Sequence, residues 1–469
     1  RRSRYLNFSL FTITFSFIKK GLFALKIQLS DHFTYRKLIK FTLPTMAMMI
    51  VSSIYGVVDG LFVSNFAGKT PFAAINLIMP YIMIFSTIGF IFGTGGSAIV
   101  AKTMGEGDKD KANNYFSLFV YVSFVLGVLF AVIGIVSVRP IAILLGAERE
   151  LLENAVKYAR IVLFVLPFNT LMFLFQSFFS TAEKPQLGLV TTISSGVMNI
   201  VLDAILVLFL PQEYKLEGAA IATAMSQVVG GTIPLIYFSR KNSSILHIGK
   251  AKFSGKIVLK VATNGSSEFM TNVSMSVVGM LYNIQLMKYA GENGVAAYGV
   301  MMYVSMIFSA MFVGYSIGVS PVFGYHDGAK NHAELKGLLK RSIVLIGGFA
   351  IGMVIAGELF AVPLANIFVG YDAELMNTTV SGFRIFAISF LFMGYAIFGS
   401  SFFTALNDGL TSAIISFLRT LVFQIAAVLL LPVIFDIDGI WYSIIVAEFM
   451  AMALSAIFVV VKRNKYHYM

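Results

Sequence analysis

The chain has 469 residues, of which 58% are hydrophobic and 12% are charged, with a formal net charge of +12. Soluble domains are about half apolar and about a quarter charged, so this composition excludes an ordinary water-soluble protein. Cysteine is absent, which excludes disulfides, Cys-ligated zinc and iron–sulfur clusters, and no cofactor is expected.

The first segment, residues 1–29, combines a basic start with an apolar run that is too short to span a membrane. It resembles the core of a signal peptide, but no small-residue cleavage site follows it. We interpret it as an interfacial or non-native extension, and we assign residues 1–37 to an N-terminal extension outside the folded halves.

Apolar runs separated by polar breaks then predict twelve membrane-spanning helices, because each run is long enough to cross a hydrocarbon core of about 30 Å. They fall near 38–65, 74–101, 115–138, 155–181, 187–210, 218–239, 257–288, 296–324, 342–367, 379–405, 411–433 and 439–461. We predict an all-α membrane protein of two pseudo-symmetric six-helix bundles. The predicted parts are an N-lobe (38–240), a cytoplasmic linker (241–256), a C-lobe (257–462) and a cytoplasmic tail (463–469).

Charged residues segregate between alternate loops. One set of loops, with the tail, carries basic residues: Lys102, Lys109, Lys111, Lys184, Arg240, Lys241, Lys250, Lys252, Lys256, Lys330, Lys336, Lys340, Arg341, Lys462, Arg463 and Lys465. The other set is mainly acidic: Glu148, Glu150, Glu213, Glu217, Glu292, Asp372, Glu374, Asp436 and Asp438. The positive-inside rule therefore predicts that both termini are cytoplasmic. It also accounts for the basic charge without a nucleic-acid partner.

The two sets of six spans are related in sequence. The segment AGKTPFAAINLIMPYIMIFS from Ala67 matches AGENGVAAYGVMMYVSMIFS from Ala290, and ARIVLF around Arg160 matches FRIFAI around Arg384. A six-span repeat gives both halves the same orientation, with an axis along the membrane normal. The substrate cavity is therefore expected between the halves, near the midplane.

Two carboxylates interrupt the apolar spans of the N-terminal half. Asp59 lies in the first span and Asp203 in the fifth, with Asn199 one turn before Asp203 and Thr223 in the sixth span. An ionisable group at mid-bilayer costs about 2.5–3.5 kcal/mol on insertion scales, which makes it a functional candidate. Four oxygen-bearing side chains suit H⁺ or Na⁺, so we predict an ion-coupling site there. The alternative is that the carboxylates only accept packing hydrogen bonds.

The repeat favours the coupling interpretation. Asp59 aligns with Tyr282, and Asn199 and Asp203 align with Phe423 and Ala427. A purely structural role would require the acids in both halves, whereas only the N-terminal half has them.

The C-terminal half holds its own charged side chains. Glu268, in the seventh span, either contacts a cationic substrate or pairs with Arg419 of the eleventh span. Glu448, in the twelfth span, is interpreted as structural, with Arg384 or a backbone donor as its partner.

Proline and glycine suggest where helices bend or pack closely. Pro44 interrupts the first span and is predicted to be a conformational hinge. Two GxxxG pairs, Gly89 with Gly93 and Gly348 with Gly352, predict close helix packing.

The chain resembles the multidrug and toxic compound extrusion (MATE) family over residues 38–462. The resemblance is carried by LPTMAMMIVSSIYGVVDGLFVSNFAG, AAINLIMP, GEGDKDKANNYFS, NIVLDAILV and GAAIATAMSQ. It implies an N-lobe cation site for H⁺ or Na⁺ at Asp59, Asn199, Asp203 and Thr223, and a bending proline at Pro44. Some members carry an acid in the tenth span, which is missing between Thr379 and Ala405. This difference favours the N-lobe and protons.

The expected function is secondary active export of organic cations or amphipathic drugs, in exchange for H⁺ or Na⁺. The expected form is a monomer in the bacterial cytoplasmic (inner) membrane. A lipid-linked oligosaccharide flippase of the same superfamily is one alternative, and a membrane-embedded enzyme or a channel is another. A flippase would favour several cavity cations, whereas Arg419 is the one clear mid-span cation in the sequence.

Overall fold

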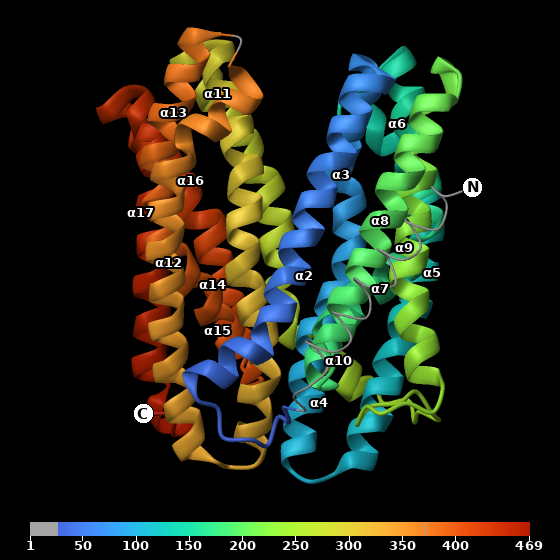
Figure 1. The fold of residues 1–469 in the computed structure, drawn as a ribbon, viewed down its shortest axis with the longest axis vertical. Helices are drawn as coiled ribbons and strands as arrows, with labels where there is room; N and C mark the ends of the chain where they lie inside the picture. The colour runs from blue at the N-terminus through green and yellow to red at the C-terminus, as the bar shows by residue number, and fades with distance from the viewer. Residues whose placement is uncertain (1–26, 371) are drawn as a thin grey trace, which may run out of the picture.

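The computed structural model describes residues 27–370 and 372–469, which form helices and loops without a strand (Figure 1). The helices of the N-terminal half are α2 (Tyr35–Phe62), η1 (Val63–Ala67), α3 (Lys69–Phe90), η2 (Ile91–Gly95), α4 (Gly96–Gly105), α5 (Lys109–Leu144), α6 (Arg149–Phe164), α7 (Leu166–Thr181), α8 (Pro185–Phe209), η3 (Gln212–Tyr214) and α9 (Lys215–Ser239). Those of the C-terminal half are α10 (Gly255–Asn264), α11 (Ser266–Gly328), α12 (His332–Val369), α13 (Ala373–Ala387), α14 (Phe390–Ala405), α15 (Gly409–Phe417), η4 (Leu418–Phe423), α16 (Gln424–Leu430), α17 (Pro432–Val461) and α18 (Arg463–Tyr466).

The predicted all-α membrane fold is confirmed. Among the described residues, nine helices are long and apolar enough to cross a membrane, and two bent pairs raise the number to eleven. The span predicted at 257–288 corresponds to α10 and the first arm of α11, residues 266–290, which is helical but is not among these eleven candidates. The second arm of α11 follows directly, because Gly291 adopts a φ of 60°, a conformation that glycine reaches without a steric penalty.

Two of the predicted spans are bent rather than continuous. The span predicted at 155–181 consists of α6 and α7, which meet at 60°, and the span predicted at 379–405 consists of α13 and α14, which meet at 50°. The first bend has a local cause, because Pro167 stands in the first turn of α7, where a missing N–H is tolerated but an uninterrupted helix is not.

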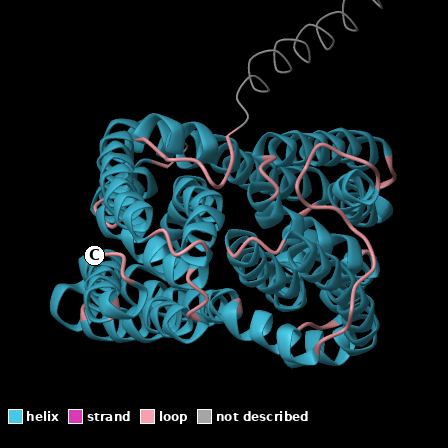
Figure 2. Cartoon of the chain, turned by 90° about the horizontal axis from the view of Figure 1, so that it is seen from below, coloured by secondary structure: helices cyan, strands magenta, loops and turns pink. Residues whose placement is uncertain are grey.

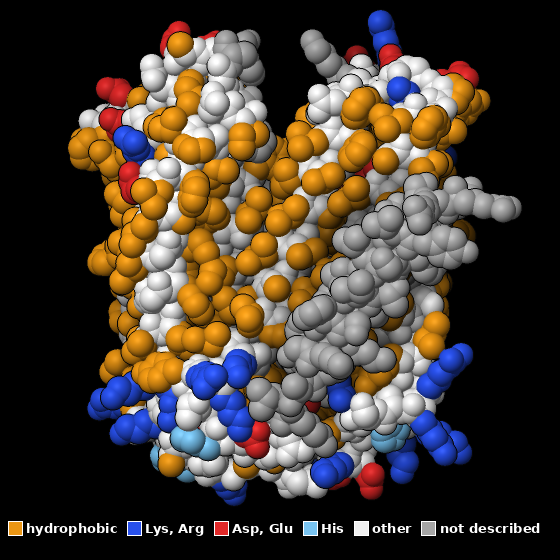
Figure 3. Space-filling view, viewed as in Figure 1, with side chains coloured by type: hydrophobic (Ala, Val, Ile, Leu, Met, Phe, Trp, Pro, Cys, Tyr) orange, Lys and Arg blue, Asp and Glu red, His pale blue; other side chains and the backbone are white. Residues whose placement is uncertain are grey.

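The helices form two bundles that lie side by side when viewed along the long axis (Figure 2). Helices α2–α9 belong to the N-terminal half and α10–α17 to the C-terminal half. Helix α2 lies at their junction, packed against α8 of its own half and α11 of the other. A cleft separates the two bundles at one end of the molecule (Figure 3).

Basic and acidic side chains concentrate at opposite ends (Figure 3). We call the end with Lys102, Lys330 and Lys462 the basic end, and the cleft opens at the opposite, acidic end. Apolar side chains cover most of the surface between them, as expected of a surface that faces lipid. The loop charges that the sequence separates are thus separated in space.

The halves meet closely at the basic end. A Cβ at Gly105 would collide with the carbonyl oxygen of Tyr325, and one at Gly328 would collide with that of Lys102. The Lys102 Nζ lies 2.8 Å from Asp327 Oδ2, which adds an ion pair between the halves. Tight backbone contact here closes the end opposite the cleft.

Residues 27–34, part of the predicted N-terminal extension, also connect the halves. The Leu29 N–H donates to Glu183 Oε1 at 2.8 Å, and the Phe33 N–H donates to Glu334 Oε1 at 2.9 Å. The His32 Nδ1 lies 2.6 Å from Glu334 Oε2. Glu183 precedes α8 and Glu334 lies in α12, so this segment crosses from one half to the other. The remaining residues of the predicted extension, 1–26, lie outside the described residues.

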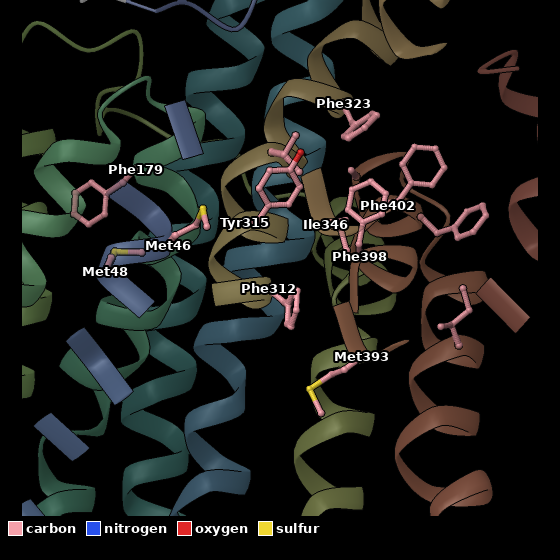
Figure 4. Packing of buried hydrophobic residues seen from close by; sticks show 14 of the residues in the cluster. Met46, Met48, Phe179, Phe312, Tyr315, Phe323, Ile346, Met393, Phe398 and Phe402 are labelled. Carbon is pink, nitrogen blue, oxygen red and sulfur yellow. The ribbon is translucent and has the colours of Figure 1, made fainter. Parts of the chain in front are cut away.

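Apolar packing fills the bundles away from the cleft. Phe312 and Tyr315 of α11 lie near Phe398 and Phe402 of α14 in the C-terminal half (Figure 4). The GxxxG prediction is confirmed for Gly89, where a Cβ would lie 2.5 Å from the Thr170 carbonyl oxygen. It is wrong for Gly348 and Gly352, which have no neighbouring atom within 4 Å of that position.

Candidate functional site

The four predicted coupling residues come together inside the N-terminal half. Helix α2 supplies Asp59, α8 supplies Asn199 and Asp203, and α9 supplies Thr223. Asp203 is 0% exposed and Asn199 1% exposed. The Thr223 hydroxyl donates to Asp59 Oδ1 at 3.5 Å, and the Asp59 carboxyl faces Asp203 and Asn199. The sequence places these residues on three separate helices, and only the packing of the helices makes them one site.

The site has too few hydrogen-bond donors for its oxygens. Both carboxylate oxygens of Asp203 and the Asn199 Oδ1 are buried without a partner among the described residues. Buried polar atoms normally have a partner, and an unpaired one costs about 1–3 kcal/mol. Two ionised carboxyls can only accept, so they repel each other unless a cation or a proton lies between them. The arrangement therefore suits reversible binding of a small cation.

Tyr158 of α6 belongs to the same site, although the sequence alone did not indicate it. Its side chain is 1% exposed and interacts with Thr223, close to Asp59 and Asp203. A tyrosine 65 residues upstream of Thr223 carries no pattern that would mark it. Its position depends on the bend between α6 and α7, which carries α6 across the face of α3 and α9.

The residues present could hold a proton or a sodium ion. Two carboxyls, one amide oxygen and one hydroxyl are hard oxygen ligands. The described residues contain no cluster of three or more His, Cys, Asp or Glu side chains, so a multi-acid metal centre of that kind does not form there.

A second candidate site is a cavity of about 290 Å³, lined almost entirely by the C-terminal half. Tyr282 and Tyr298 stack in it with ring centroids 5.1 Å apart and planes 2° apart. The Tyr282 hydroxyl donates to Gln424 Oε1 at 2.7 Å. Such a space, mostly apolar with a few polar groups, is typical of a small-molecule site.

The charges in this cavity pair differently from the expectation. Arg419 binds Glu448 through two hydrogen bonds, Nε to Oε2 at 2.8 Å and Nη2 to Oε1 at 3.0 Å. Arg384, the expected partner of Glu448, instead lies 3.6 Å from Glu358. The expected partner of Glu448 was wrong, although its structural role was not, because α17 faces η4, where the wider turn of a π-helix presents Arg419 to it.

Glu268 consequently lacks the arginine that was one of its two predicted partners. Its side chain lines the cavity, and no hydrogen bond or ion pair reaches its carboxylate from the described residues. Since Arg419 and Glu448 pair with each other, Glu268 is the one carboxyl lining the cavity that has no ion-pair partner among the described residues. Of the two alternatives, contact with a cationic substrate is the one left open by this geometry.

Pro44 lies buried inside α2, which continues through it. Because proline removes one backbone hydrogen bond, α2 is easier to bend at Pro44 than elsewhere. The hinge role stays a prediction.

Comparisons with known proteins agree with this arrangement. The family model described as MatE matches the chain twice, over residues 44–205 and 269–430. Each half therefore carries one copy, which supports the repeat seen in the sequence.

Relatives and solved structures cover nearly the whole chain. The multidrug export protein MepA of Staphylococcus haemolyticus is 27% identical over 445 residues, which cover 92% of this chain and 94% of that protein. MepA of Staphylococcus aureus (strain MRSA252) is 25% identical, with 91% and 93% covered. A structure described as MATE in complex with MaL6 aligns with a TM-score of 0.88 at 22% identity, over 93% of this chain and 98% of that one. An outward-facing multidrug resistance MATE family transporter of the MOP superfamily aligns with a TM-score of 0.86 at 23% identity, with 93% and 98% covered.

Proposed function

Because the chain belongs to the MatE family, we propose that it exports small organic cations or amphipathic drugs across a bacterial cytoplasmic membrane in exchange for H⁺ or Na⁺. The chain is a transporter rather than an enzyme. The observation that carries the proposal is the carboxylate site, where Asp59 and Asp203 lie together and Asp203 has no hydrogen-bond donor among the described residues. A carboxylate that is costly to keep in a membrane and has no hydrogen-bond donor suits the reversible binding of an ion.

The proposed cycle uses the cleft at the acidic end, which we assign to the outside by the positive-inside rule. An ion enters from this side and neutralises Asp59 and Asp203. The N-terminal half then relaxes around α2, with Pro44 as the hinge, and the halves rock to open the basic end. The ion and the drug exchange because each of them binds more tightly to one of the two conformations, open at the acidic end or open at the basic end. The driving energy is about 2.3 kcal/mol per charge and per 100 mV of membrane potential.

The second cavity supports a cationic cargo. Glu268 supplies an unpaired carboxyl that can pair with a cation, and the stacked Tyr282 and Tyr298 offer aromatic surface for a planar or apolar molecule. An oligosaccharide pyrophosphate would require positive charge instead. Arg419 is held by Glu448, so this arginine is not free to bind a phosphate, which disfavours the flippase alternative.

The test uses purified protein in lipid vesicles with separately imposed pH and sodium gradients. We expect gradient-driven transport of ethidium by the wild type, and none above empty vesicles for Asp59→Asn or Asp203→Asn. The reason is that an amide keeps the shape of the carboxyl but cannot take up a cation by charge neutralisation.

Glu150→Gln is the matched control, since it removes an acid from the first turn of α6 at the acidic end and should transport normally. Normal coupling by both aspartate variants would refute the site. Ion currents without coupled ethidium movement would instead identify a channel.

A further inference from the structure

The cavity of about 290 Å³ in the C-terminal half, here called the cargo cavity, ends at a contact between the two halves. Of the described residues that line it, only Thr94 of η2 belongs to the N-terminal half. The lining begins on α11 at Ser267 and ends on α14 at Thr404. Asp408, four residues beyond Thr404, pairs with Lys462 of the basic end. These positions therefore mark the side of the cavity that faces the basic end.

The side chain of Asn264 closes this side of the cavity. Asn264 is the last residue of α10 and is 2% exposed. Its Nδ2 donates to the carbonyl oxygens of Thr404 at 3.0 Å and Gly95 at 3.3 Å, and Asn407 Oδ1 lies 3.4 Å away. Thr404 and Asn407 belong to the C-terminal half, whereas Gly95 ends η2 in the N-terminal half. One amide group therefore joins the two halves next to the cargo cavity.

The surroundings fix the orientation of this amide. All three partners of Asn264 Nδ2 are oxygen acceptors, and Asn264 Oδ1 has no donor among the described residues. Exchanging the two amide atoms would set an oxygen against two carbonyl oxygens, which cannot donate. Asn264 therefore acts as a donor, and a side chain of similar size without an N–H could not join the halves in this way.

Backbone atoms pack closely around the bond. A Cβ at Gly95 would lie 2.6 Å from the Val261 carbonyl oxygen and 2.7 Å from the Gly265 nitrogen. A Cβ at Gly265 would overlap the carbonyl oxygen of Ile91. Helix η2 is thus in direct backbone contact with the joint between α10 and α11, which lies near α4 in Figure 1. A drug cannot pass between them while this contact is made.

The repeat provides an internal comparison. At the offset of 223 residues, the same helix contact recurs between Gly318 and Thr42, where a Cβ at Gly318 would lie 3.2 Å from Thr42 Cγ2. Phe41 stands there in place of Asn264. Its side chain is 2% exposed and has no hydrogen-bond donor. The fold therefore makes this contact without an amide, and the copy beside the cargo cavity adds a bond that can be made and broken.

We propose that Asn264 is a positioning residue of the transport cycle and that its bond to Gly95 is the inner gate of the cargo cavity. The inference rests on the proposed function. While the bond is made, the cavity is separated from the basic end. When the halves rock, the bond breaks, η2 leaves α10, and a drug enters beside Glu268, which lies one turn after Asn264. One neutral hydrogen bond shifts an equilibrium by up to about 10-fold, which is enough to bias the gate and weak enough to be broken in every cycle.

The first test measures access to the cavity from each end. Because the chain has no cysteine, Thr271→Cys places a single thiol on the cavity wall, one turn beyond Ser267. A membrane-impermeant thiol reagent is added to inside-out vesicles, which expose the basic end, or to right-side-out vesicles, which expose the acidic end. Asn264→Leu should speed labelling from the basic end by about 10-fold, because it removes the donor at similar volume. Labelling from the acidic end should stay unchanged, whereas a merely destabilised protein would label faster from both ends.

Asn113→Leu is the matched control. The Asn113 amide also donates to two backbone carbonyl oxygens, of Lys109 at 3.1 Å and Ile245 at 3.3 Å, but both lie outside the contact between the halves. The same substitution there should leave Thr271→Cys labelling at its original rate from both ends.

The second test opens the same contact from the other half. Gly95→Ala should also speed labelling from the basic end, because its Cβ overlaps the Val261 carbonyl oxygen. Gly352→Ala is the control, since its Cβ meets no atom within 4 Å, and it should label like the unchanged protein.

An unchanged labelling rate from the basic end in Asn264→Leu would overturn the gate, and so would equally faster labelling from both ends. Asn264→Asp keeps the shape of the amide, but its carboxylate can only accept. It should speed labelling from the basic end at least as much, and it decides the test if the leucine variant is not recovered from membranes. Ethidium transport with unchanged labelling would refute the gate alone. Ethidium that is neither transported nor slows the labelling of Thr271→Cys would refute the proposed function instead.

Discussion

At the scale of single residues, the decisive feature of the C-terminal half is that Arg419 pairs with Glu448 and not with Glu268. Its side chain is 15% exposed and that of Glu448 5% exposed, and the two form a bidentate pair. Away from water, an ion pair can contribute close to nothing to the net free energy of folding, whereas one partner left alone carries the full desolvation cost of a buried charge. This choice also leaves Glu268 free to bind a cation.

We expect Arg419→Met and Glu448→Leu each to lower the free energy of unfolding by about 3–5 kcal/mol, because each strands the opposite charge. The double variant should recover most of the loss. Thermal unfolding in detergent, followed by tryptophan fluorescence, checks this cycle. Additive losses would mean that the two residues do not depend on each other.

Glu268 gives a second prediction at this scale. Glu268→Gln should weaken the binding of a monovalent aromatic cation by about 10-fold, the equivalent of about 1.4 kcal/mol, with little change for a neutral analogue of the same shape. Equilibrium binding by ethidium fluorescence measures the effect. Glu358→Gln, which changes a 46% exposed acid paired with Arg384, is the control and should bind both ligands normally.

At the scale of helices, glycine decides how close two elements come. The Gly89 face of α3 touches the backbone of α7 at Thr170, whereas Gly352 of α12 faces open space. The two positions share the same sequence motif but not the same surroundings. A motif on one helix therefore indicates close packing only when another helix is there to meet it.

We expect the same substitution to have opposite effects at these two positions. Gly89→Ala should destabilise the protein by about 1–3 kcal/mol, because the new Cβ overlaps the α7 backbone. Gly352→Ala should stabilise it by about 0.5–1 kcal/mol, because alanine is the better helix former and meets no neighbour. Parallel thermal unfolding of the two variants tests the contrast, and equal shifts would refute it.

At the scale of the whole molecule, the basic end is fastened in three ways. Gly105 packs on the backbone of Tyr325 and Gly328 on that of Lys102, Lys102 pairs with Asp327, and residues 27–34 donate to Glu183 and Glu334. All three kinds of contact favour the conformation in which the cleft is open at the acidic end. They therefore bias the balance between the two conformations that alternating access requires.

Removing some of these contacts should shift that balance toward opening at the basic end. We expect Lys102→Ala combined with Glu334→Gln to increase the open population about tenfold, equivalent to about 1.4 kcal/mol. Spin labels on the α4–α5 and α11–α12 loops would report it as a longer distance by pulsed electron paramagnetic resonance. Lys109→Ala, at the exposed start of α5, is the control and should leave the distance distribution unchanged. An unchanged distribution in the double variant would show that these contacts do not hold the basic end closed.

Much of the fold is predictable from the amino-acid sequence. The lengths of the apolar runs indicate the spans, the loop charges indicate their orientation, and the repeat indicates the division into halves. The four coupling candidates are also recognisable, because Asp59 and Asp203 are too costly in a membrane to go unnoticed. Tyr158 and Asn264 are not, since uncharged polar residues in a membrane helix carry no comparable penalty.

By itself, the amino-acid sequence determined that this protein spans a membrane as two related bundles and which acids need an explanation. Only the tertiary structure decided that Arg419 pairs with Glu448, that Gly352 meets nothing, and that a small cavity forms where Tyr55, Gln176 and Ser195 meet. The physical reason is that hydrophobicity and charge are properties of each residue and can be summed along the chain. Pairing, close approach and empty volume depend on distances between helices that are far apart in sequence.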